Sequence, residues 1–487
     1  MKRRSFLLGA AAGAAVLATR GAGAAAEKRD VIVIGAGLAG LGAALMLRDA
    51  GLSVLLLEAN DKVGGRVNTV DYADGQLEMG ASQIGHDYAR VRDMVRRLDV
   101  PLGDGAHLYA PYAFVLDGKL ISAEDWPSAP ENKLKGEERE RLPHTLRGLY
   151  LEERSPFSAV DEWLDPEADV YDVSLFEWLR RQGASDQAIR LIDQGLVDPG
   201  VRGVSALTLL QEDARAKQSL RSLQAKPGTE KMDAYQRFAL SSSHVVGGMR
   251  RFPEAMAAEL GDDLRLSTPV AAIDLDGPEA EVRSEAGERF RASLVISAVP
   301  FTTLRRVPIT PGLQGEQAMA VQAMPYGRQS QTWLRIKGEP YWEVDGYNAS
   351  LWSNGPVTLI RQEIGYDGSR ELVSALSIGS HATRLDQLPE ADRGRFVLQH
   401  LAEIRPATAG RLEVVTVQSW QEHPYIEGVR HSYAPGQAAR FRFAMIQPHA
   451  RLHFAGEHTR RLEVGMEAAM ESGERAALEV IQRLSSA

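Results

Sequence analysis

Three glycines near the start of the chain have the spacing of a phosphate-binding turn. Gly35, Gly37 and Gly40 form a G-x-G-x-x-G pattern directly after the apolar run DVIVI. In such a turn the first glycine permits a tight bend, the second lets the backbone approach a pyrophosphate, and the third lets a helix pack closely on a strand. Glu58 follows at the interval expected for an acid that accepts hydrogen bonds from a ribose. The pattern therefore predicts a dinucleotide site.

The elements that must position these residues are also present in the sequence. Residues 30–34 are too short for a helix and rich in β-branched side chains, which predicts a buried parallel strand. A helix beginning near Leu38 would direct its positive end at the phosphates, and residues 53–57 predict a second strand that ends at Glu58. Because these parts occur in register, they favour a nucleotide-binding βαβ unit over a glycine-rich turn with a purely structural role. The fingerprint alone suits NAD as well as FAD.

Two further motifs favour FAD. The sequence LEANDKVGGRV at residues 57–67 follows the second strand, and LHFAGEHTRRLEVGMEAAMESGERAA occupies residues 452–477. Together they resemble the glutathione-reductase-like FAD proteins, and within these the flavin amine oxidase family, over about residues 30–484. The resemblance implies that Arg66 contacts the dinucleotide phosphates and that Glu457 helps to hold the ribityl and pyrophosphate region. It also implies a helix from near Met466 whose N-terminus stabilises negative charge on the reduced flavin.

The resemblance assigns a set of cofactor-binding residues. The segment QLEMGASQIG at residues 76–85 is similar to a family segment that passes along the flavin. Val270 matches a position that contacts adenine through its backbone in relatives, although an ordinary strand valine explains it equally well. The expected cofactor-binding residues are Gly35, Gly37, Leu38, Ala39, Gly40, Glu58, Ala59, Gly64, Gly65, Arg66, Gly80, Ala81, Ser82, Val270, Gly456, Glu457, Met466, Glu467 and Ala468.

The resemblance also implies the fold class, which is α/β with a Rossmann-like FAD-binding domain and an interleaved α+β substrate domain. The charged, helix-prone stretches between about residues 105 and 229 resemble no phosphate site and are assigned to the substrate domain. We expect the FAD-binding domain in residues 27–104, 230–310 and 405–487, and the substrate domain in residues 105–229 and 311–404.

The catalytic positions depart from the family pattern. Flavin amine oxidases usually carry a lysine near flavin N5 and an aromatic pair that frames the substrate amine. The lysine position falls on Gln331 when counted from Gly327 and on Thr332 when counted back from Trp342. The two aromatic positions fall on Arg430 and near Gly465, so the cation–π basis for selecting a protonated amine is lost.

The predicted pocket over the flavin is therefore polar. We expect Gln83, Gln331, Arg430 and Glu463 to line it, with Trp420 packed beside the flavin. Gln331, Arg430 and Trp420 are the candidate catalytic residues.

Arg430 has two interpretations. It could pair bidentately with a substrate carboxylate or another anion, or it could be an internal ion-pair partner of Glu463 or another acid. His86, His431 and His458 also lie in segments near the predicted flavin, but a lone histidine is more often structural than an acid or base.

Composition limits the possible partners and the attachment of the cofactor. The 487 residues are 44% hydrophobic and 25% charged, with a net charge of -9, which argues against nucleic acid as a partner. No metal site is predicted. The chain has no cysteine, so disulfides and a cysteinyl flavin link are excluded, and FAD is expected to bind non-covalently.

Residues 1–26 predict an export signal. Arg3 and Arg4 precede SFLL, an Ala/Gly/Leu-rich centre and small residues near Ala24–Ala26, which is typical of a twin-arginine signal peptide. An uncleaved membrane anchor is the alternative, but the apolar run is short for a spanning helix. Because this route exports folded proteins, the chain would reach the periplasm, or be secreted, with its FAD bound. No permanent membrane anchor is expected after cleavage.

These observations favour a periplasmic FAD-dependent oxidoreductase that takes hydride from a small substrate, with an amine or amino acid preferred. Without the lysine, electron transfer to a cytochrome or quinone is favoured over transfer to O2. Two alternatives stay open: dehydrogenation or desaturation of a non-amine substrate, and flavin binding without turnover.

Overall fold

The computed structural model describes residues 28–73, 75–104, 111–197, 199–225, 228–229, 240–365 and 369–486. The predicted export signal therefore lies outside the described residues.

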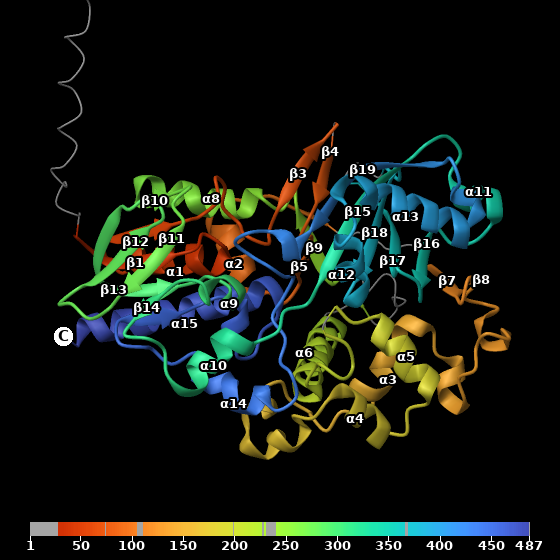
Figure 1. Cartoon of the computed structure of the whole chain (residues 1–487), viewed down its shortest axis with the longest axis horizontal. Helices are drawn as coiled ribbons and strands as arrows, with labels where there is room; N and C mark the ends of the chain where they lie inside the picture. The colour runs from red at the N-terminus through yellow and green to blue at the C-terminus, as the bar shows by residue number, and fades with distance from the viewer. Residues whose placement is uncertain are drawn as a thin grey trace, which may run out of the picture.

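The first sheet has eight strands and forms the left half of the molecule (Figure 1). Strand β1 (Lys28–Ile34) lies at its centre and pairs in parallel with β2 (Val54–Leu57) on one side and β13 (Arg289–Ser297) on the other. Residues 31–33 of β1 have no exposed surface, as expected for a parallel strand covered on both faces. The other strands are β10 (Leu264–Arg265), β11 (Val270–Asp274), β12 (Ala280–Ser284), β14 (Ile309–Thr310) and β20 (Leu452–Phe454).

Helices from the two ends of the chain cover one face of this sheet. Helix α1 (Leu38–Asp49) and helix α15 (Gly465–Ser485) pack against each other, and α8 (Arg251–Leu260) packs on α1. Helix α2 (Ala89–Arg97) packs on α15. The first and last helices of the described chain, α1 and α15, therefore share one hydrophobic core beside the first sheet.

The second sheet has seven strands and lies on the right in Figure 1. Helix α13 (Glu390–Ile404) packs on β19, and α12 (Ser380–Asp386) packs on β15 and β18. In order across the sheet the strands are β19 (Leu412–Ser419), β15 (Gln329–Ile336), β18 (Leu372–Ile378), β17 (Leu359–Glu363), β16 (Ser350–Ser353), β7 (Tyr112–Leu116) and β8 (Lys119–Ile121).

A group of helices lies below the second sheet in Figure 1. The longest is α6 (Ala206–Gln224), and the others are α3 (Leu146–Leu151), α4 (Leu175–Arg181) and α5 (Asp186–Gln194). Further elements are β3 (Thr69–Tyr72), β4 (Gly75–Glu78), β5 (Ile84–Gly85), β6 (Leu102–Asp104), β9 (Ser242–Val245), α9 (Phe301–Leu304), α10 (Gly315–Ala323), α11 (Tyr341–Asp345) and α14 (Gln437–Ala444).

The predicted α/β class with two interleaved parts is confirmed. One boundary differs from the predicted ranges, because β19 pairs antiparallel with β15 as an edge strand of the second sheet. The chain therefore returns to the first sheet after residue 419 rather than at residue 405. Nothing local to residues 412–419 shows which sheet they will join, because that depends on a partner far away in the sequence.

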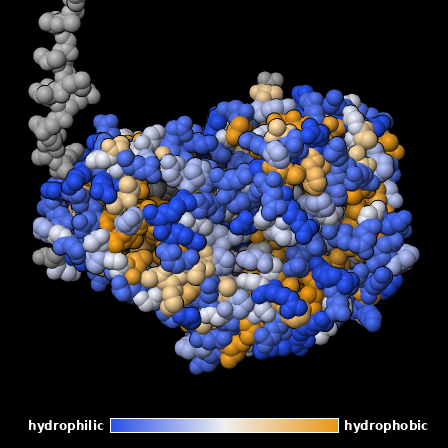
Figure 2. All heavy atoms as spheres, in the orientation of Figure 1, coloured by the Kyte–Doolittle hydropathy of each residue, from blue (hydrophilic) through white to orange (hydrophobic). Residues whose placement is uncertain are grey.

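The face of the molecule shown in Figure 2 is mostly hydrophilic, with apolar side chains in separate patches. Among the described residues, no helix has both the length and the apolar character needed to cross a membrane.

Candidate functional site

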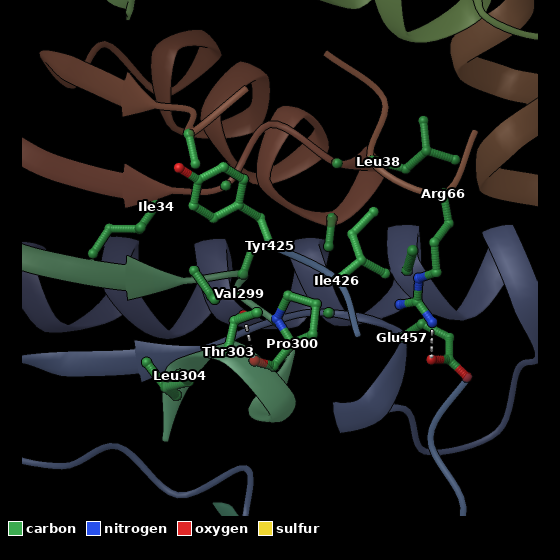
Figure 3. A pocket seen from close by; sticks show the side chains of 18 of the residues that line it. Ile34, Leu38, Arg66, Val299, Pro300, Thr303, Leu304, Tyr425, Ile426 and Glu457 are labelled. Carbon is green, nitrogen blue, oxygen red and sulfur yellow. Dashed lines mark hydrogen bonds and ion pairs between the residues drawn. The ribbon is translucent and has the colours of Figure 1, made fainter. Parts of the chain in front are cut away.

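A cavity of about 750 Å³ runs from the glycine turn after β1 to the end of the second sheet. Figure 3 shows the apolar side chains of Ile34, Val299 and Leu304 at one end and the paired Arg66 and Glu457 at the other. The cavity thus has an apolar part and a charged part, both bordered by the βαβ unit.

The glycine turn opens onto this cavity. A Cβ atom at Gly40 would lie 1.9 Å from the carbonyl oxygen of Gly35, so only glycine allows α1 to approach the turn this closely. Gly35 has a φ of 100°, which favours glycine. At Gly37, by contrast, a Cβ would meet nothing within 4 Å, and Gly37 lines the cavity. The backbone at Gly37 is therefore accessible to a pyrophosphate.

Glu58 is held at the end of β2 by short hydrogen bonds. The backbone N–H of Ala36 donates to Glu58 Oε2 at 2.6 Å, and the backbone N–H of Asn60 donates to Oε1 at 2.9 Å. The Glu58 side chain borders the cavity although the residue is buried. A fixed carboxylate at this place fits the acceptor that a ribose requires.

Arg66 and Glu457 form the charged part of the cavity. Arg66 Nη1 lies 3.2 Å from Glu457 Oε2 and donates to the carbonyl oxygen of Val429 at 2.7 Å. His431 Nδ1 donates to Glu457 Oε1 at 2.7 Å. Burial alone would raise the pKa of Glu457, but His431, Arg66 and Arg460 together hold it well below its ordinary value. Glu457 is therefore an ionised acceptor that orients the arginine.

His458 is a buried packing residue. Its ring meets that of Phe301 at a centroid distance of 4.3 Å, and a Cβ at Gly456 would lie 2.4 Å from its Cε1 atom. Burial lowers the pKa of His458 to about 3, so the ring is uncharged at neutral pH. His458 does not line the cavity, and neither does His86 or His431.

The start of α15 borders the cavity. Val464, Gly465 and Met466 line the cavity, whereas Glu467 and Ala468 do not. The Glu467 carboxylate instead accepts hydrogen bonds from the backbone N–H groups of Arg90 and Val91, at 2.9 and 3.1 Å. It caps the N-terminus of α2, which is a structural role that the family resemblance did not indicate.

Most of the residues expected to bind the cofactor lie together in the cavity wall. Gly40, Ser82, Glu467 and Ala468 are the ones that do not border it. The residues that do are Gly35, Gly37, Leu38, Ala39, Glu58, Ala59, Gly64, Gly65, Arg66, Gly80, Ala81, Val270, Gly456, Glu457 and Met466.

The wall beside Trp420 is built from closely approaching segments. A Cβ at Gly80 would lie 2.0 Å from the carbonyl oxygen of Arg66 and 3.1 Å from Trp420 Cζ2. Trp420 donates through Nε1 to the carbonyl oxygen of Met79 at 2.9 Å and is almost fully buried. An accessible glycine turn, a fixed ribose acceptor and a rigid aromatic wall in one cavity fit FAD.

Arg430 has an ion-pair partner that the sequence did not indicate. Arg430 Nη1 donates to Glu212 Oε2 at 2.8 Å, while Glu463, the partner considered from the sequence, pairs with Arg215 at 2.6 Å. Burial would raise the pKa of Glu212, but Arg430 and Arg460 keep it below its ordinary value. The Arg430 side chain lines the cavity and is 29% exposed.

The three other residues expected over the flavin, Gln83, Gln331 and Glu463, lie outside the cavity wall. Gln331 is buried in β15, and Gln329, two residues earlier on the same face of the strand, lines the cavity instead. Gln83 does not line it either. Thr332, the other candidate for the lysine position, has no exposed surface. No lysine borders the cavity within the described part of the chain.

Sequence reasoning missed many polar residues of the cavity wall, among them Tyr88, Glu212, Gln329 and Arg460. Glu212 lies on α6, in a charged region that was interpreted as a helical part of the substrate domain. Its neighbours Gln211 and Arg215 hold Leu462 and Glu463 through bonds of 2.8 and 2.6 Å. These contacts join segments about 250 residues apart. The sequence around either segment therefore does not predict them.

Comparisons with known proteins agree with this geometry. The model of the family described as flavin containing amine oxidoreductase matches residues 38–481. A probable flavin-containing monoamine oxidase A of Dictyostelium discoideum is 24% identical over 474 residues, which cover 93% of this chain and 98% of the relative. Amine oxidase [flavin-containing] B of Bos taurus is 27% identical over 484 residues, covering 94% and 87%.

Solved structures share the fold. A putrescine oxidase with bound putrescine has a TM-score of 0.74 and 23% identity, over 94% of this chain and all of that one. Cyclohexylamine oxidase from Brevibacterium oxydans has a TM-score of 0.75 at 23% identity, with the same coverage. Together with the family match over most of the chain, these observations show that the protein is an FAD-dependent enzyme and belongs to the flavin containing amine oxidoreductase family.

Proposed function

We propose that the protein oxidises the C–N bond of a small amine or amino acid and passes the electrons from FAD to a cytochrome or quinone. The observation that carries this proposal is a single cavity that joins the glycine turn at Gly37 to the polar residues around Arg430. FAD, when bound, supplies the hydride acceptor. The chain itself binds and orients both molecules, with Trp420 as a rigid wall and Arg430 as a charged contact.

Non-covalent attachment of FAD is part of the proposal. The family resemblance places Val429 at the position where some relatives attach flavin, and an aliphatic side chain offers no nucleophile. The chain has no cysteine at any position. Precipitation of the protein with acid is expected to release all of the flavin into the supernatant, and retention of flavin in the pellet would contradict this.

The choice of acceptor rests on the absence of lysine from the described cavity wall. A lysine near flavin N5 is the feature that the resemblance links to the amine oxidases, so its replacement favours a dehydrogenase. We expect the reduced protein to react slowly with O2 and quickly with an artificial acceptor such as ferricenium. Rapid reoxidation by air would support the oxidase alternative instead.

Export to the periplasm is proposed from residues 1–26, with Arg3 and Arg4 as the twin-arginine pair. Replacing both by lysine in the full-length chain is expected to leave the protein in the cytoplasm with its FAD bound. Export of this variant at the normal level would contradict the route.

Two other functions are favoured by a specific observation, which is the placement of Arg430 where the family pattern has an aromatic residue. A charged wall suits a non-amine substrate that is dehydrogenated or desaturated, or a ligand that is bound without turnover. The test is an anaerobic screen of the FAD-loaded protein with amines, amino acids and non-amine carboxylates, following loss of the oxidised flavin absorbance. Bleaching by amines or amino acids supports the proposed function, whereas bleaching by none of them overturns it.

A further inference from the structure

Residues 424–427 separate part of the cavity from the solvent, and we call them the strap. Tyr425 and Ile426 border the cavity, and Figure 3 shows their side chains among the apolar residues that line it. Pro424, at the start of the strap, is exposed. A stretch that faces the cavity on one side and solvent on the other is a candidate passage for the dinucleotide, provided that it can move as a unit.

The base of the strap is tied by backbone hydrogen bonds. The carbonyl oxygen of His423 accepts from the N–H groups of Ile426 and Glu427, at 3.2 and 3.1 Å, and that of Trp420 accepts from Gly428 at 3.1 Å. These bonds lie within one loop and are kept if the strap moves as a unit. Glu427 has a φ of 53°, which a non-glycine residue rarely adopts, so contacts with the rest of the protein must hold the strap in place.

Two side chains from a neighbouring segment provide such contacts. Thr302 Oγ1 donates to the carbonyl oxygen of Ile426 at 2.6 Å. Arg306 Nη2 donates to the carbonyl oxygen of Pro424 at 2.7 Å, and its Nη1 pairs with the carboxylate of Glu427. Thr302 lies in α9, and Arg306 lies just after the end of that helix. Arg306 therefore holds both ends of the strap, and Thr302 holds its middle.

The contacts of Arg306 are accessible to water. The side chains of Arg306 and Glu427 are 52% and 31% exposed, so water competes for both groups and their ion pair adds little to the stability of the fold. Such a pair can open without unfolding of the surrounding core. The exposure and the position of Arg306 suit a contact that forms and breaks while the protein stays folded.

We propose that FAD enters and leaves the protein beneath the strap, and that Arg306 and Thr302 are positioning residues that keep the strap closed. The inference needs FAD binding, which follows from the family to which the chain belongs. It goes beyond the proposed function and depends on neither the substrate nor the electron acceptor.

The first experiment measures the rates of FAD release and uptake separately. Release from the loaded protein and uptake by the apoprotein are followed by the change in flavin fluorescence, and the unfolding temperature of each apoprotein shows that the variant is folded. Arg306→Gln and Thr302→Val are each expected to raise both rates by about tenfold, which corresponds to one hydrogen bond. The dissociation constant should change less than either rate, because FAD crosses the opened strap in both directions.

This comparison also separates the strap from a direct contact with FAD. Arg306 itself borders the cavity. If it acted only by binding FAD, Arg306→Gln would speed release without speeding uptake. That result would overturn the inference, and so would unchanged rates in both Arg306→Gln and Thr302→Val.

Arg305→Gln is the matched control. Arg305 is adjacent to Arg306, but it donates to the carbonyl oxygens of Phe301 and Met324, at 3.1 and 3.3 Å, and lies outside the cavity wall. Its variant is expected to release and take up FAD like the wild-type protein. Equal acceleration in Arg305→Gln and Arg306→Gln would remove the argument for the strap.

The second experiment closes the strap covalently. Because the chain has no cysteine, a short bifunctional maleimide can join only the two thiols of the Arg306→Cys, Glu427→Cys double variant. Linking the FAD-loaded protein is expected to stop release, and linking the apoprotein is expected to stop uptake. The same variant treated with N-ethylmaleimide, which caps both thiols without joining them, should exchange FAD quickly. If the linked and the capped proteins exchange FAD at the same rate, FAD passes elsewhere and the inference fails.

Discussion

The guanidinium group of Arg430 is joined to the carboxylate of Glu212 by a hydrogen bond of 2.8 Å. This bond connects the cavity wall beside Val429 to helix α6 in the helical region. Arg460 Nη2 lies 3.2 Å from the other oxygen of Glu212. One carboxylate thus holds two arginines, and its removal would leave both cations without this partner.

Glu212→Gln is therefore expected to destabilise the protein by roughly 2–3 kcal/mol, somewhat below the range for breaking a fully buried pair because Arg430 stays partly exposed. Urea unfolding of the FAD-loaded protein measures this change. Glu316→Gln provides the control, because the pair of Glu316 with Arg440 is largely exposed and is worth less than about 1 kcal/mol. A similar small cost for both variants would contradict the assigned role of Glu212.

Gly465→Ala tests the contact with Tyr88. Gly465 has a φ of 60°, so alanine there introduces backbone strain of about 1 kcal/mol and also crowds the Tyr88 hydroxyl. In the Tyr88→Phe background the crowding is absent, so the double variant is expected to be more stable than the sum of the two single effects predicts. Unfolding free energies of the four proteins measure this coupling.

Gly118→Ala separates the strain from the contact, because Gly118 has a φ of 78° and a Cβ there would meet nothing within 4 Å. It is expected to carry the backbone cost alone and to show no coupling to Tyr88→Phe. Coupling of equal size at both glycines would remove the argument for a specific contact.

Gly37→Ala should separate cofactor binding from folding. The added methyl group meets no protein atom within 4 Å but projects where the backbone must approach the pyrophosphate. We expect the FAD-free protein to unfold at its normal temperature, while FAD binds at least tenfold more weakly. The flavin-to-protein absorbance ratio after dialysis measures the binding.

Gly195→Ala, at the end of α5 and outside the cavity wall, should leave that ratio unchanged. If the Gly37→Ala variant retained a normal amount of FAD, the pyrophosphate would not bind at Gly37.

His458 should contribute to acid unfolding. Because burial lowers its pKa to about 3, the unfolded chain binds a proton near pH 6.5 that the folded protein does not bind until about pH 3. Stability is therefore lost as the pH falls between these values, by up to about 1.4 kcal/mol per pH unit for one proton. In His458→Gln, the pH dependence of the unfolding free energy is expected to be shallower by this amount between pH 6 and pH 4.

His449→Gln is the matched control for this measurement, because His449 lies near the surface with its Nε2 atom 2.7 Å from the carbonyl oxygen of Pro311. Its slope is expected to follow the wild-type protein. A wild-type slope in His458→Gln would mean that other groups dominate acid unfolding in this range.

Much of the first sheet could be predicted because its signals are local. The β-branched run at residues 30–34, the glycines after it and the acid at Glu58 lie within one short segment, and the structure places them in β1, α1 and the end of β2. Helix α15, which the family resemblance implied from near Met466, begins at Gly465. For β1, α1 and β2 the residue types and the glycine spacing within one short segment were enough to predict the elements.

The polar wall of the cavity could not be predicted in the same way. Whether a residue reaches the cavity depends on which strand residue faces it, and counting from two ends of residues 327–342 already gave two answers, Gln331 and Thr332. The pairing of β15 with β19 also shifts register between Trp333 and Leu334, so the partner strand does not follow a simple alternation either. Gln329, which neither count selected, lies in the wall.

The bonds from Glu467 to the backbone of Arg90 and Val91 join the first turn of α15 to the first turn of α2. One of these helices begins beside the expected flavin, and the other begins at Tyr88. We expect FAD binding at the start of α15 to affect the start of α2 through this side chain, because the Glu467 carboxylate accepts both N–H groups. FAD should slow hydrogen exchange at the amides of Arg90 and Val91, and Glu467→Gln should weaken that effect.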